Sequence, residues 1–307
     1  TVHNLAFQGI FPPGSVVQLG LPPDSFDING VEYYGNLSFL KAGLYYADQI
    51  TTVSPNYAKE IQIEPLGFGL QGLLAARQPD LAGIINGIAI TEWDPETDHY
   101  LIKNYNSKNL SNKTANKTAL QQQMGLTVDA HIPLLGVVSR LSHQKGIDLL
   151  IQIAPQLIKM PAQLVVLGRG HPELEHLLST LAQAYPKSIA VHVGFNEALS
   201  HLMEAGIDCF LMPSRFEPCG LNQMYSQRYG TPPIVHATGG LLDTVVDCTP
   251  VTLANHTASG FVFYSMTAAS LLDTVKRAVL AYHNKKTWQS LQKNGMAKDF
   301  SWNASAM

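Results

Sequence analysis

The strongest constraint on the fold is the regular alternation of apolar runs and amphipathic segments that begins at Pro133. Continuous apolar runs are typical of strands buried on both faces, as in a parallel sheet covered by helices. Right-handed crossovers then give a doubly wound α/β domain, whose ligands bind outside the carboxyl ends of the strands. The predicted strands are Leu134–Ser139, Gln163–Gly168, Ile189–Val193, Cys209–Met212, Pro233–His236 and Gly260–Phe263. The predicted helices between them are Ile147–Lys159, Pro172–Tyr185, Asn196–Ala205 and Gly220–Tyr229.

The first 125 residues are less regular. Apolar residues at helical spacing predict a helix over Leu37–Gln49, and a proline near its start predicts another over Pro55–Ile61. Two buried strands are predicted, at Ile50–Val53 and Gly83–Ile88. The polar tract Asn104–Lys117 predicts a surface loop that enters a helix ending at Met124. At about 150 residues per domain the length favours two domains, which we place at 1–128 and 129–307.

Composition excludes several classes of protein. Apolar residues make up 46% of the chain, which excludes a disordered protein. The 20 basic and 23 acidic residues form no basic stripe, which argues against nucleic acid or an anionic membrane as partner. No apolar run approaches the roughly 20 residues that span a bilayer. Three cysteines without CxxC spacing cannot form a disulfide framework or a four-thiolate zinc site, so we expect a reducing, cytoplasmic location.

The two ends of the chain have the pattern of interrupted elements. Thr1 to Asn4 lacks both a methionine and a signal-peptide pattern, and resembles the end of a strand. Phe300 to Met307 resembles the opening of a helix. We therefore expect an internal fragment of a longer protein.

Two cations follow the first strand of the regular region. Arg140 and Lys145 lie five residues apart, between the strand end and the N-terminus of a helix. Backbone N–H groups and the helix dipole favour an anion there, and Arg and Lys are the usual phosphate-binding side chains. The alternative is a solvated loop with surface charges, and on the residues alone the two interpretations are equally good.

A glycine turn follows the fifth strand. Thr238, Gly239 and Gly240 precede a helix predicted to open at Leu241 or Leu242. Such glycines let a ligand approach the backbone, although a simple tight turn explains them equally well. The run Gly168-Arg169-Gly170 is weaker evidence, since it lacks the third glycine of the dinucleotide fingerprint.

The fourth strand ends in Pro213-Ser214-Arg215-Phe216-Glu217-Pro218-Cys219-Gly220-Leu221. A carboxylate at Glu217 can hold sugar hydroxyls or stabilise a cationic transition state. The alternative is a structural ion pair between Arg215 and Glu217. Cys219 suits a reactive thiol, but a small packing residue is the commoner role.

The remaining candidates are fewer. His3 follows an apolar stub, where a histidine usually has a structural role. The other histidines show no metal-ligand spacing, and no Gly-x-Ser-x-Gly elbow suggests a serine hydrolase. Aromatic residues are frequent in the first half; such rings suit sugars, but most of these should be ordinary core.

Taken together, these segments resemble the glycogen and starch synthases of glycosyltransferase family 5, over essentially the whole chain. The matching stretches are TVHNLAFQG at 1–9, GNLSFLKAG at 35–43, TVSPNYAKEI at 52–61, GIINGI at 83–88, WDPETD at 93–98, GVVSRLSHQKG at 136–146, PSRFEPCGL at 213–221 and TGGLLDTV at 238–245. The bacterial type, which uses ADP-glucose, is the closer likeness.

The resemblance implies a GT-B fold, in which two Rossmann-like domains flank the active site and the first is incomplete in this chain. It implies transfer of glucose from ADP-glucose to the non-reducing 4-OH end of an α-1,4-glucan such as glycogen, with retention and without metal or other cofactor. Arg140 and Lys145 would bind the ADP phosphates, and Glu217 would lie at the glucose. His3 would approach from the other domain. The remaining implied substrate-binding residues are Phe195, which would stack on adenine, and Cys219, Gly220, Leu221, Thr238, Gly239 and Gly240.

The chain also departs from the family pattern. The donor-binding Lys-Thr-Gly-Gly-Leu loop is missing, Phe195 replaces the usual tyrosine, and Ala89 replaces an aspartate. We therefore expect little activity from this chain alone, although its second half should bind ADP.

Other functions stay open. A related GT-B enzyme with another donor, such as a sucrose- or trehalose-type synthase, would use the same cations; Tyr225, where family 4 has a second glutamate, argues against it. A non-catalytic glucan- or nucleotide-binding protein is a third interpretation. A nicotinamide dehydrogenase is the weakest, because the glycine fingerprint is absent. The residues do not firmly separate ADP-glucose from UDP-glucose.

Overall fold

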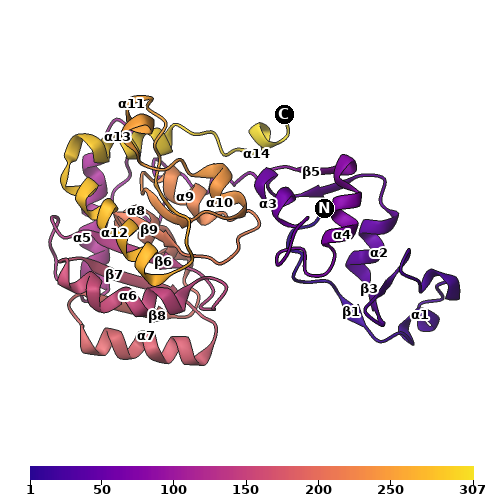
Figure 1. Cartoon of the computed structure of the whole chain (residues 1–307). Helices are drawn as coiled ribbons and strands as arrows, with labels where there is room; N and C mark the ends of the chain where they lie inside the picture. Colours follow the sequence, from indigo (N-terminus) through magenta and orange to yellow (C-terminus); the bar gives the residue numbers. More distant parts are fainter. The chain divides into compact units, whose positions relative to one another are not determined.

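The computed structural model describes all residues from 1 to 307 and divides the chain into two compact units, Thr1–Ile85 and Asn86–Met307 (Figure 1). The segment 86–128 belongs to the second unit by its contacts, because helix α5 (Lys113–Gln123) packs against α8 (Glu197–Gly206). The domain boundary expected after residue 128 stays a prediction, and the compact units divide at a different place.

The first unit contains two small sheets. One is antiparallel with strand order β1-β3-β2, and the other pairs β4 with β5 in parallel. Ser38 and Ser54 each begin a helix of this unit by accepting a hydrogen bond from a backbone N–H, the usual role of serine at an N-cap. Its elements are β1 (Ile10–Phe11), α1 (Ser15–Gln18), η1 (Pro23–Ser25), β2 (Glu32–Tyr33), β3 (Asn36–Ser38), α2 (Phe39–Tyr46), β4 (Ile50–Thr52), α3 (Pro55–Glu60), α4 (Gln71–Ala76), η2 (Gln78–Asp80) and β5 (Leu81–Gly83).

The second unit is built on one six-stranded sheet, in which every neighbouring pair is parallel and the strand order is β11-β10-β9-β6-β7-β8. The strands are β6 (Leu134–Val138), β7 (Gln163–Gly168), β8 (Ile189–Val193), β9 (Cys209–Met212), β10 (Pro233–His236) and β11 (Phe261–Phe263). The other elements are η3 (Leu110–Asn112), α6 (Ile147–Lys159), α7 (Pro172–Ala184), α9 (Asn222–Arg228), α10 (Gly239–Thr244), α11 (Pro250–Ala254), α12 (Ala268–His283), α13 (Lys285–Met296) and α14 (Trp302–Ser305).

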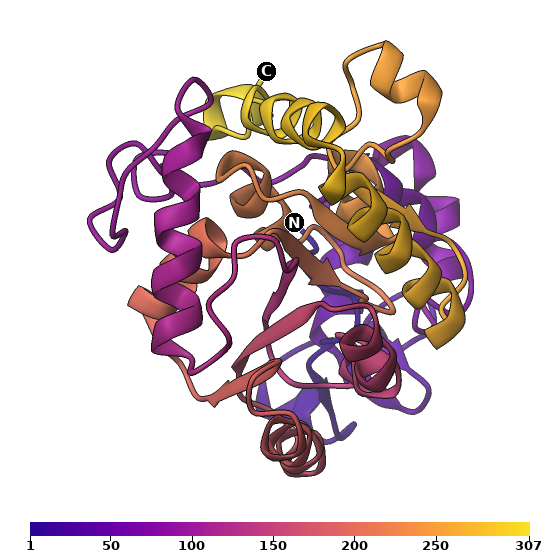
Figure 2. The ribbon, with the colours of Figure 1, turned by 90° about the vertical axis from the view of Figure 1, so that its left-hand side faces the viewer.

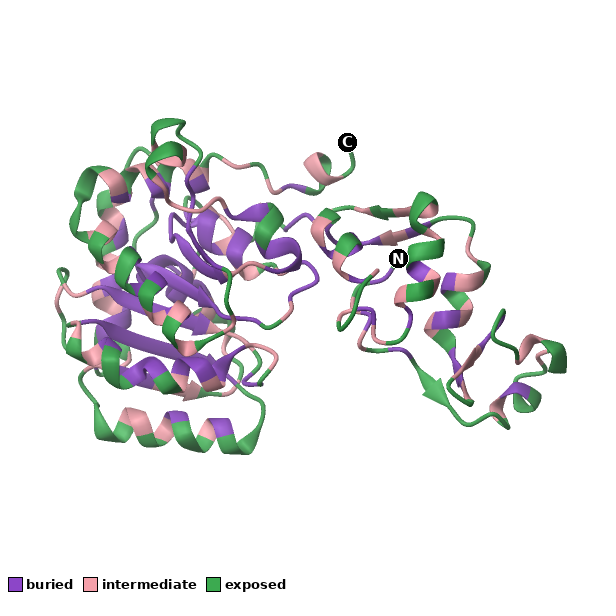
Figure 3. Cartoon of the chain, viewed as in Figure 1, coloured by how far each residue is buried: buried purple, intermediate pink, exposed green.

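Helices cover both faces of this sheet. Successive strand residues point to opposite faces, so Leu135 and Val137 join the core under α6, α7 and α12, while Leu134 joins the core under α5 and α8. In Figure 2, α5 lies on the left of the sheet and α12 on the right. Figure 3 shows the consequence, which is buried strands between helices whose outer faces are exposed. No helix in this chain has the length and apolar character that crossing a bilayer requires.

The predicted doubly wound sheet is confirmed, with every predicted strand and helix from Pro133 to His236 present within a few residues. Helix α10 begins at Gly239, two or three residues earlier than the predicted start at Leu241 or Leu242.

Three expectations for the first half are wrong. The strand predicted at Gly83–Ile88 ends at Gly83, and Ile84 is 47% exposed. Leu37 and Ser38 belong to β3, so the helix predicted from Leu37 begins only at Phe39. The polar tract predicted as a surface loop instead contains the start of α5, whose lysines are buried.

The strand order places a topological switch point between β6 and β9. The chain builds outward from β6 through β7 to β8, and then returns to β9 on the other side of β6. Loops leaving two such strands diverge to opposite faces of the sheet, and ligands of doubly wound proteins bind in the crevice that this creates. The segments that leave these two strands carry Arg140, Lys145 and Glu217.

Candidate active site

A cavity of about 230 Å³ lies at this switch point. The ends of β6 and β9 form its floor, and Arg140, Lys145, Ser214 and Glu217 are among its lining residues. Gly220 and Leu221 also line it. The structure thus brings together the predicted cations and the predicted carboxylate, although they lie more than 70 residues apart in the sequence.

Lys145 and Glu217 form an ion pair in this cavity. The Lys145 ammonium donates to Glu217 Oε2, which also accepts a hydrogen bond from Ser214 Oγ at 3.0 Å. The Lys145 side chain is 24% exposed and that of Glu217 only 9%. A charged pair at the edge of a cavity is little screened by water, so it can act strongly on a bound anion or sugar.

The alternative pairing of Arg215 with Glu217 is wrong. The Arg215 guanidinium instead binds Asp148 through two hydrogen bonds of 2.8 and 2.6 Å, and it also donates to the His143 carbonyl. The hydrogen bonds from Arg215 hold the pKa of Asp148 below its usual range. This bidentate pair joins the loop after β9 to the first turn of α6. Because the Arg215 guanidinium is occupied by Asp148, the cation that pairs with Glu217 is Lys145.

The two loops also touch through their backbones. The Arg215 N–H donates to the Gln144 carbonyl at 2.8 Å. Gly146 has a φ of +69°, and a Cβ there would lie 1.8 Å from the Pro213 carbonyl oxygen. Only glycine permits this approach, which fixes the backbone beside Lys145 against the loop that carries Glu217.

The glycine turn after β10 supports the same loop from the other side. A Cβ on Gly239 would lie 2.0 Å from the Glu217 carbonyl oxygen, and one on Gly240 would lie 2.2 Å from that of Cys219. The Gly240 N–H donates to the carbonyls of Glu217 and Pro218, at 3.2 and 3.1 Å. In this structure the turn therefore positions the Glu217 loop by close packing. The buried Thr238 precedes it as the N-cap of α10.

Cys219 is buried, and burial raises the pKa of its thiol to about 11. The thiolate is the reactive form of cysteine, so this side chain behaves as a packing residue near neutral pH. His236 supports the neighbouring loop through Nδ1, which lies 2.9 Å from the Ser214 carbonyl oxygen. Burial lowers the pKa of His236, so its neutral form donates that hydrogen bond.

A second, larger cavity of about 490 Å³ adjoins the first and shares Arg140 with it. Phe195 lies at its edge with 89% of its surface exposed, so the face of its ring is accessible to a ligand. Trp93 and Tyr225 also line it, with their rings stacked at 4.1 Å. This arrangement of aromatic faces beside arginine is suited to a flat, anionic ligand.

Several lining residues were not among the sequence-based candidates. Ser214 belongs to the stretch PSRFEPCGL at 213–221, directly after a predicted strand, so its position could have identified it as a lining residue. Arg169 was dismissed with its weak glycine motif, but it lines the larger cavity. Trp93 and Tyr225 come from distant segments, and their stacking depends on the tertiary fold. Glu204 is a buried carboxyl on α8 that lines the same cavity, and burial raises its pKa well above the usual range.

His3 lies in the first unit, exposed, after a bridge between Val2 and Thr52 of β4. Its approach to the reacting glucose stays a prediction.

Comparisons with known proteins agree with this geometry. Residues 1–76 match the family model of the starch synthase catalytic domain, and residues 126–296 match that of the glycosyl transferases group 1. The chain is 65% identical over 306 residues to a glycogen synthase of Nitrosomonas eutropha, covering all of this chain and 61% of that protein. It is 61% identical over 305 residues to a glycogen synthase of Nitrosospira multiformis, with 99% and 61% coverage. The chain thus spans about three fifths of the length of these relatives.

Solved structures show the same likeness. The catalytic domain of starch synthase IV from Arabidopsis thaliana, bound to ADP and acarbose, superposes with a TM-score of 0.93 at 32% identity. That match covers 99% of this chain and 64% of the plant protein. A sucrose-phosphate synthase from Thermosynechococcus elongatus shares the fold at a TM-score of 0.58 and 20% identity, with 87% and 57% coverage. The predicted α/β GT-B class is confirmed. Because the second family model covers more than half of the chain, the chain belongs to the glycosyl transferases group 1, and its relatives are glycogen and starch synthases.

Proposed function

We propose that this chain belongs to an enzyme that transfers glucose from ADP-glucose to the non-reducing 4-OH end of an α-1,4-glucan, with retention at the anomeric carbon. One observation carries the proposal. In a relative of glycogen synthases, Arg140, Lys145 and Glu217 line one cavity at the topological switch point, where doubly wound sheets bind their ligands.

Arg140 and Lys145 are suited to the diphosphate of the donor. Arg140 lies at the boundary of the two cavities, and Lys145 already donates to a carboxylate in the smaller one. A diphosphate bound between them would form ion pairs with both cations, and Arg140 can bind phosphate oxygens through two parallel hydrogen bonds. Phe195 would then stack on adenine in the larger cavity, where the exposed ring offers an apolar face.

Glu217 would act at the glucose. In the proposed transfer the bond between the anomeric carbon and the leaving phosphate oxygen breaks, and ADP departs with the electron pair. The acceptor oxygen bonds to the anomeric carbon, and its proton passes to the leaving phosphate. The sugar is oxocarbenium-like between these events, and a fixed carboxylate nearby stabilises its positive charge.

The remaining residues would complete the site. Cys219, Gly220 and Leu221 belong to the loop of Glu217, and Thr238, Gly239 and Gly240 hold that loop in place. His3 would approach the reacting glucose from the first unit. The plant starch synthase was solved with ADP and acarbose, which supports a nucleotide-sugar donor and a glucan acceptor for this chain.

Calorimetric titration tests the donor site directly. We expect ADP to bind, and Arg140→Ala and Lys145→Ala each to weaken it roughly ten- to hundredfold, since a charge-assisted hydrogen bond is worth about 1.5–3 kcal/mol. Lys276→Ala is the matched control, because that lysine is exposed on α12 and pairs only with Asp273. UDP in place of ADP measures the preference for the base. Equal ADP affinity in all three variants would remove both cations from the site.

Glucose incorporation into glycogen by the full-length protein tests the role of Glu217, because we expect little activity from this chain alone. Glu217→Gln keeps the shape of the side chain and a hydrogen-bond acceptor for Ser214, but it removes the negative charge. We expect turnover to fall at least a hundredfold while ADP affinity is kept, because Lys145 is then free to serve the phosphates alone. If turnover is unchanged, the carboxylate has no part in the transfer.

A further inference from the structure

Three side chains capable of binding a metal ion meet beside helix α8. Glu92 lies in the turn that begins at Ala89, and Glu197 and His201 lie one turn apart on α8. One possible ligand atom from each of these residues lies within 4.8 Å of the other two. Both glutamates are exposed, whereas the His201 side chain is only 1% exposed.

The second observation is a buried nitrogen without a partner. His201 Nδ1 lies 2.7 Å from Asp98 Oδ2, but Nε2 has no hydrogen-bond partner although it is buried. Buried polar atoms nearly always have one, so this atom needs an explanation. The Asp98 carboxylate also accepts hydrogen bonds from the Tyr229 hydroxyl and, at 2.9 Å, from the Tyr100 N–H. Asp98 is the acceptor in this set of contacts, so Nδ1 carries the proton and Nε2 offers its lone pair.

The imidazole ring is also held in place. Trp93 stacks on it with a centroid distance of 3.9 Å and an interplanar angle of 10°, and Tyr100 lies at 4.8 Å on a tilted approach. The Tyr229 hydroxyl binds the same Asp98 oxygen at 2.6 Å. A ring fixed in this way cannot turn to find another partner for Nε2, so the nitrogen is preorganised for whatever binds there.

We propose that Glu92, Glu197 and His201 form a binding site for a divalent transition-metal ion, with Zn²⁺ as the best fit. One imidazole nitrogen and two carboxylate oxygens are usual zinc ligands, and three protein ligands leave a fourth position for water. The pair of Asp98 and His201 has the arrangement in which a carboxylate orients a metal-binding histidine. The two glutamates are exposed, so they can close on the ion to the required distance of about 2 Å.

This site does not depend on the proposed transferase function. It joins the segment before α5 to helix α8, and Trp93 links it to the larger cavity, which that ring also lines. A bound ion would hold the turn of Glu92 against α8, so zinc is expected to raise the thermal stability of the protein by preferential binding to the folded state.

Calorimetry with zinc chloride on the chelator-treated protein tests the proposal. We expect one ion to bind at this site, and Glu92→Gln and Glu197→Gln each to weaken its affinity at least tenfold. Both substitutions are isosteric and lie at exposed positions, so the fold should be retained. Glu173→Gln is the matched control, since Glu173 is also an exposed glutamate in the first turn of a helix, and it should leave zinc affinity unchanged.

Nitrogen NMR of the histidine side chains gives an independent measurement. Zinc should shift the Nε2 resonance of His201, and either glutamine variant should remove that shift at the same zinc concentration. The proposal is overturned if zinc instead perturbs His143 and His171, whose rings lie 5.9 Å apart elsewhere. It is equally overturned if zinc affinity is the same in both glutamine variants as in the control.

Discussion

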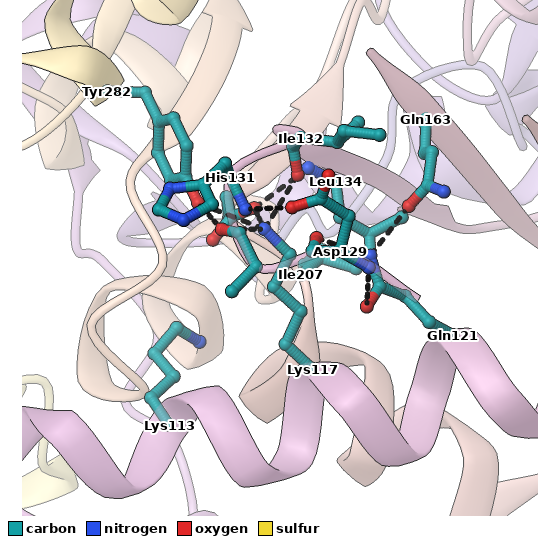
Figure 4. Close-up of polar contacts among 12 residues, drawn as sticks. Lys113, Lys117, Gln121, Asp129, His131, Ile132, Leu134, Gln163, Ile207 and Tyr282 are labelled. Carbon is teal, nitrogen blue, oxygen red and sulfur yellow. Dashed lines mark hydrogen bonds and ion pairs between the residues drawn. The ribbon is translucent and has the colours of Figure 1, made fainter. Parts of the chain in front are cut away.

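The buried lysine of α5 provides the sharpest test of how the second unit is held together. Lys117 Nζ lies 2.7 Å from Asp208 Oδ2, and both side chains are at least nine-tenths buried. The same ammonium donates to the carbonyls of Ala130 and Ile132 and to the Tyr282 hydroxyl (Figure 4). One cation thus joins α5, the segment before β6, the segment before β9 and α12.

Lys117→Met removes this cation while it keeps most of the side-chain volume. Asp208 would then be a buried carboxylate without its cation, and breaking a buried pair in this way costs about 3–5 kcal/mol. For domains of about 150–250 residues each kcal/mol lowers the melting temperature by about 2–4 °C, so we expect a loss of roughly 6–20 °C. Lys276→Met removes one partner of a pair whose side chains are 49% and 72% exposed, and it should cost less than about 0.5 kcal/mol.

The pH dependence gives the same prediction a second readout. Burial already raises the pKa of Asp208, and Lys117 opposes that rise. Without the lysine the folded-state pKa rises further above the unfolded value. The folded variant then binds a proton at Asp208 more tightly than the unfolded chain does. This proton stabilises the folded state at low pH, and the contribution is lost as the pH rises through the pKa that Asp208 has in the folded state. Lys117→Met should therefore cost less stability at pH 5 than at pH 7.5.

Urea denaturation followed by circular dichroism measures these differences. The double variant Lys117→Met/Asp208→Asn removes both charges, so its loss should be smaller than the sum of the two single losses. If Lys117→Met costs no more than Lys276→Met at either pH, the buried pair does not hold these elements together and the reasoning is refuted.

Three further predictions concern the candidate active site. Phe195→Ala should leave stability unchanged but weaken ADP binding by about 1–3 kcal/mol in calorimetry, the usual value of stacking on a base, and an unchanged affinity would place adenine elsewhere. Gly146→Ala should destabilise the protein in urea by at least roughly 1–3 kcal/mol from its left-handed backbone alone, with more from the clash with Pro213, and a neutral result would contradict the close approach. Iodoacetamide at pH 8 should modify the half-buried Cys248 well before Cys219, since at a pKa of about 11 only about one Cys219 in a thousand is ionised, and the reverse order in peptide mass spectrometry would rule out this burial.

The parallel sheet was predictable because its signal is local. Strands such as Gln163–Gly168 are buried on both faces, so each is an unbroken apolar run between polar segments. An apolar run alone does not predict a strand, because the neighbouring strand must also extend far enough to pair with it. Gly83 to Ile88 has the apolar composition of a strand, but β4 pairs with the segment only as far as Gly83, and Ile84 is exposed.

The burial of α5 could not be predicted from its composition. Lys113 and Lys117 belong to a polar tract, and such tracts usually face water. Lys113 Nζ instead donates to the carbonyls of Glu204 and Ala205 and to Thr231 Oγ1, all about 90 residues or more away. Backbone carbonyls leave no trace in the sequence, so residue types alone do not reveal that a lysine will be satisfied by them.

The candidate site shows the same division between local and distant information. The positions of Arg140, Lys145 and Glu217 after strand ends placed them at the ligand-binding edge of the predicted sheet, because the carboxyl ends of parallel strands share one edge. The partner of Glu217 was not predictable, since Arg215 is two residues away in sequence but pairs with Asp148 in space. Sequence proximity favours the wrong pair, because side chains two residues apart need not face the same way.

The support behind Glu217 explains why the ion pair with Lys145 can be both tight and available to a ligand. Its loop is held by the bidentate pair between Arg215 and Asp148, by the close approach of Gly146, and by the glycine turn at Gly239. None of these contacts uses the carboxylate itself, whose hydrogen bonds are to Lys145 and Ser214. A ligand can therefore exchange partners with the Glu217 carboxylate without breaking the contacts that position it. The contacts that hold the loop are thus different from those that the carboxylate would exchange with a substrate. A site that stabilises a transition state requires this, because the negative charge of Glu217 must be fixed in position before the substrate binds.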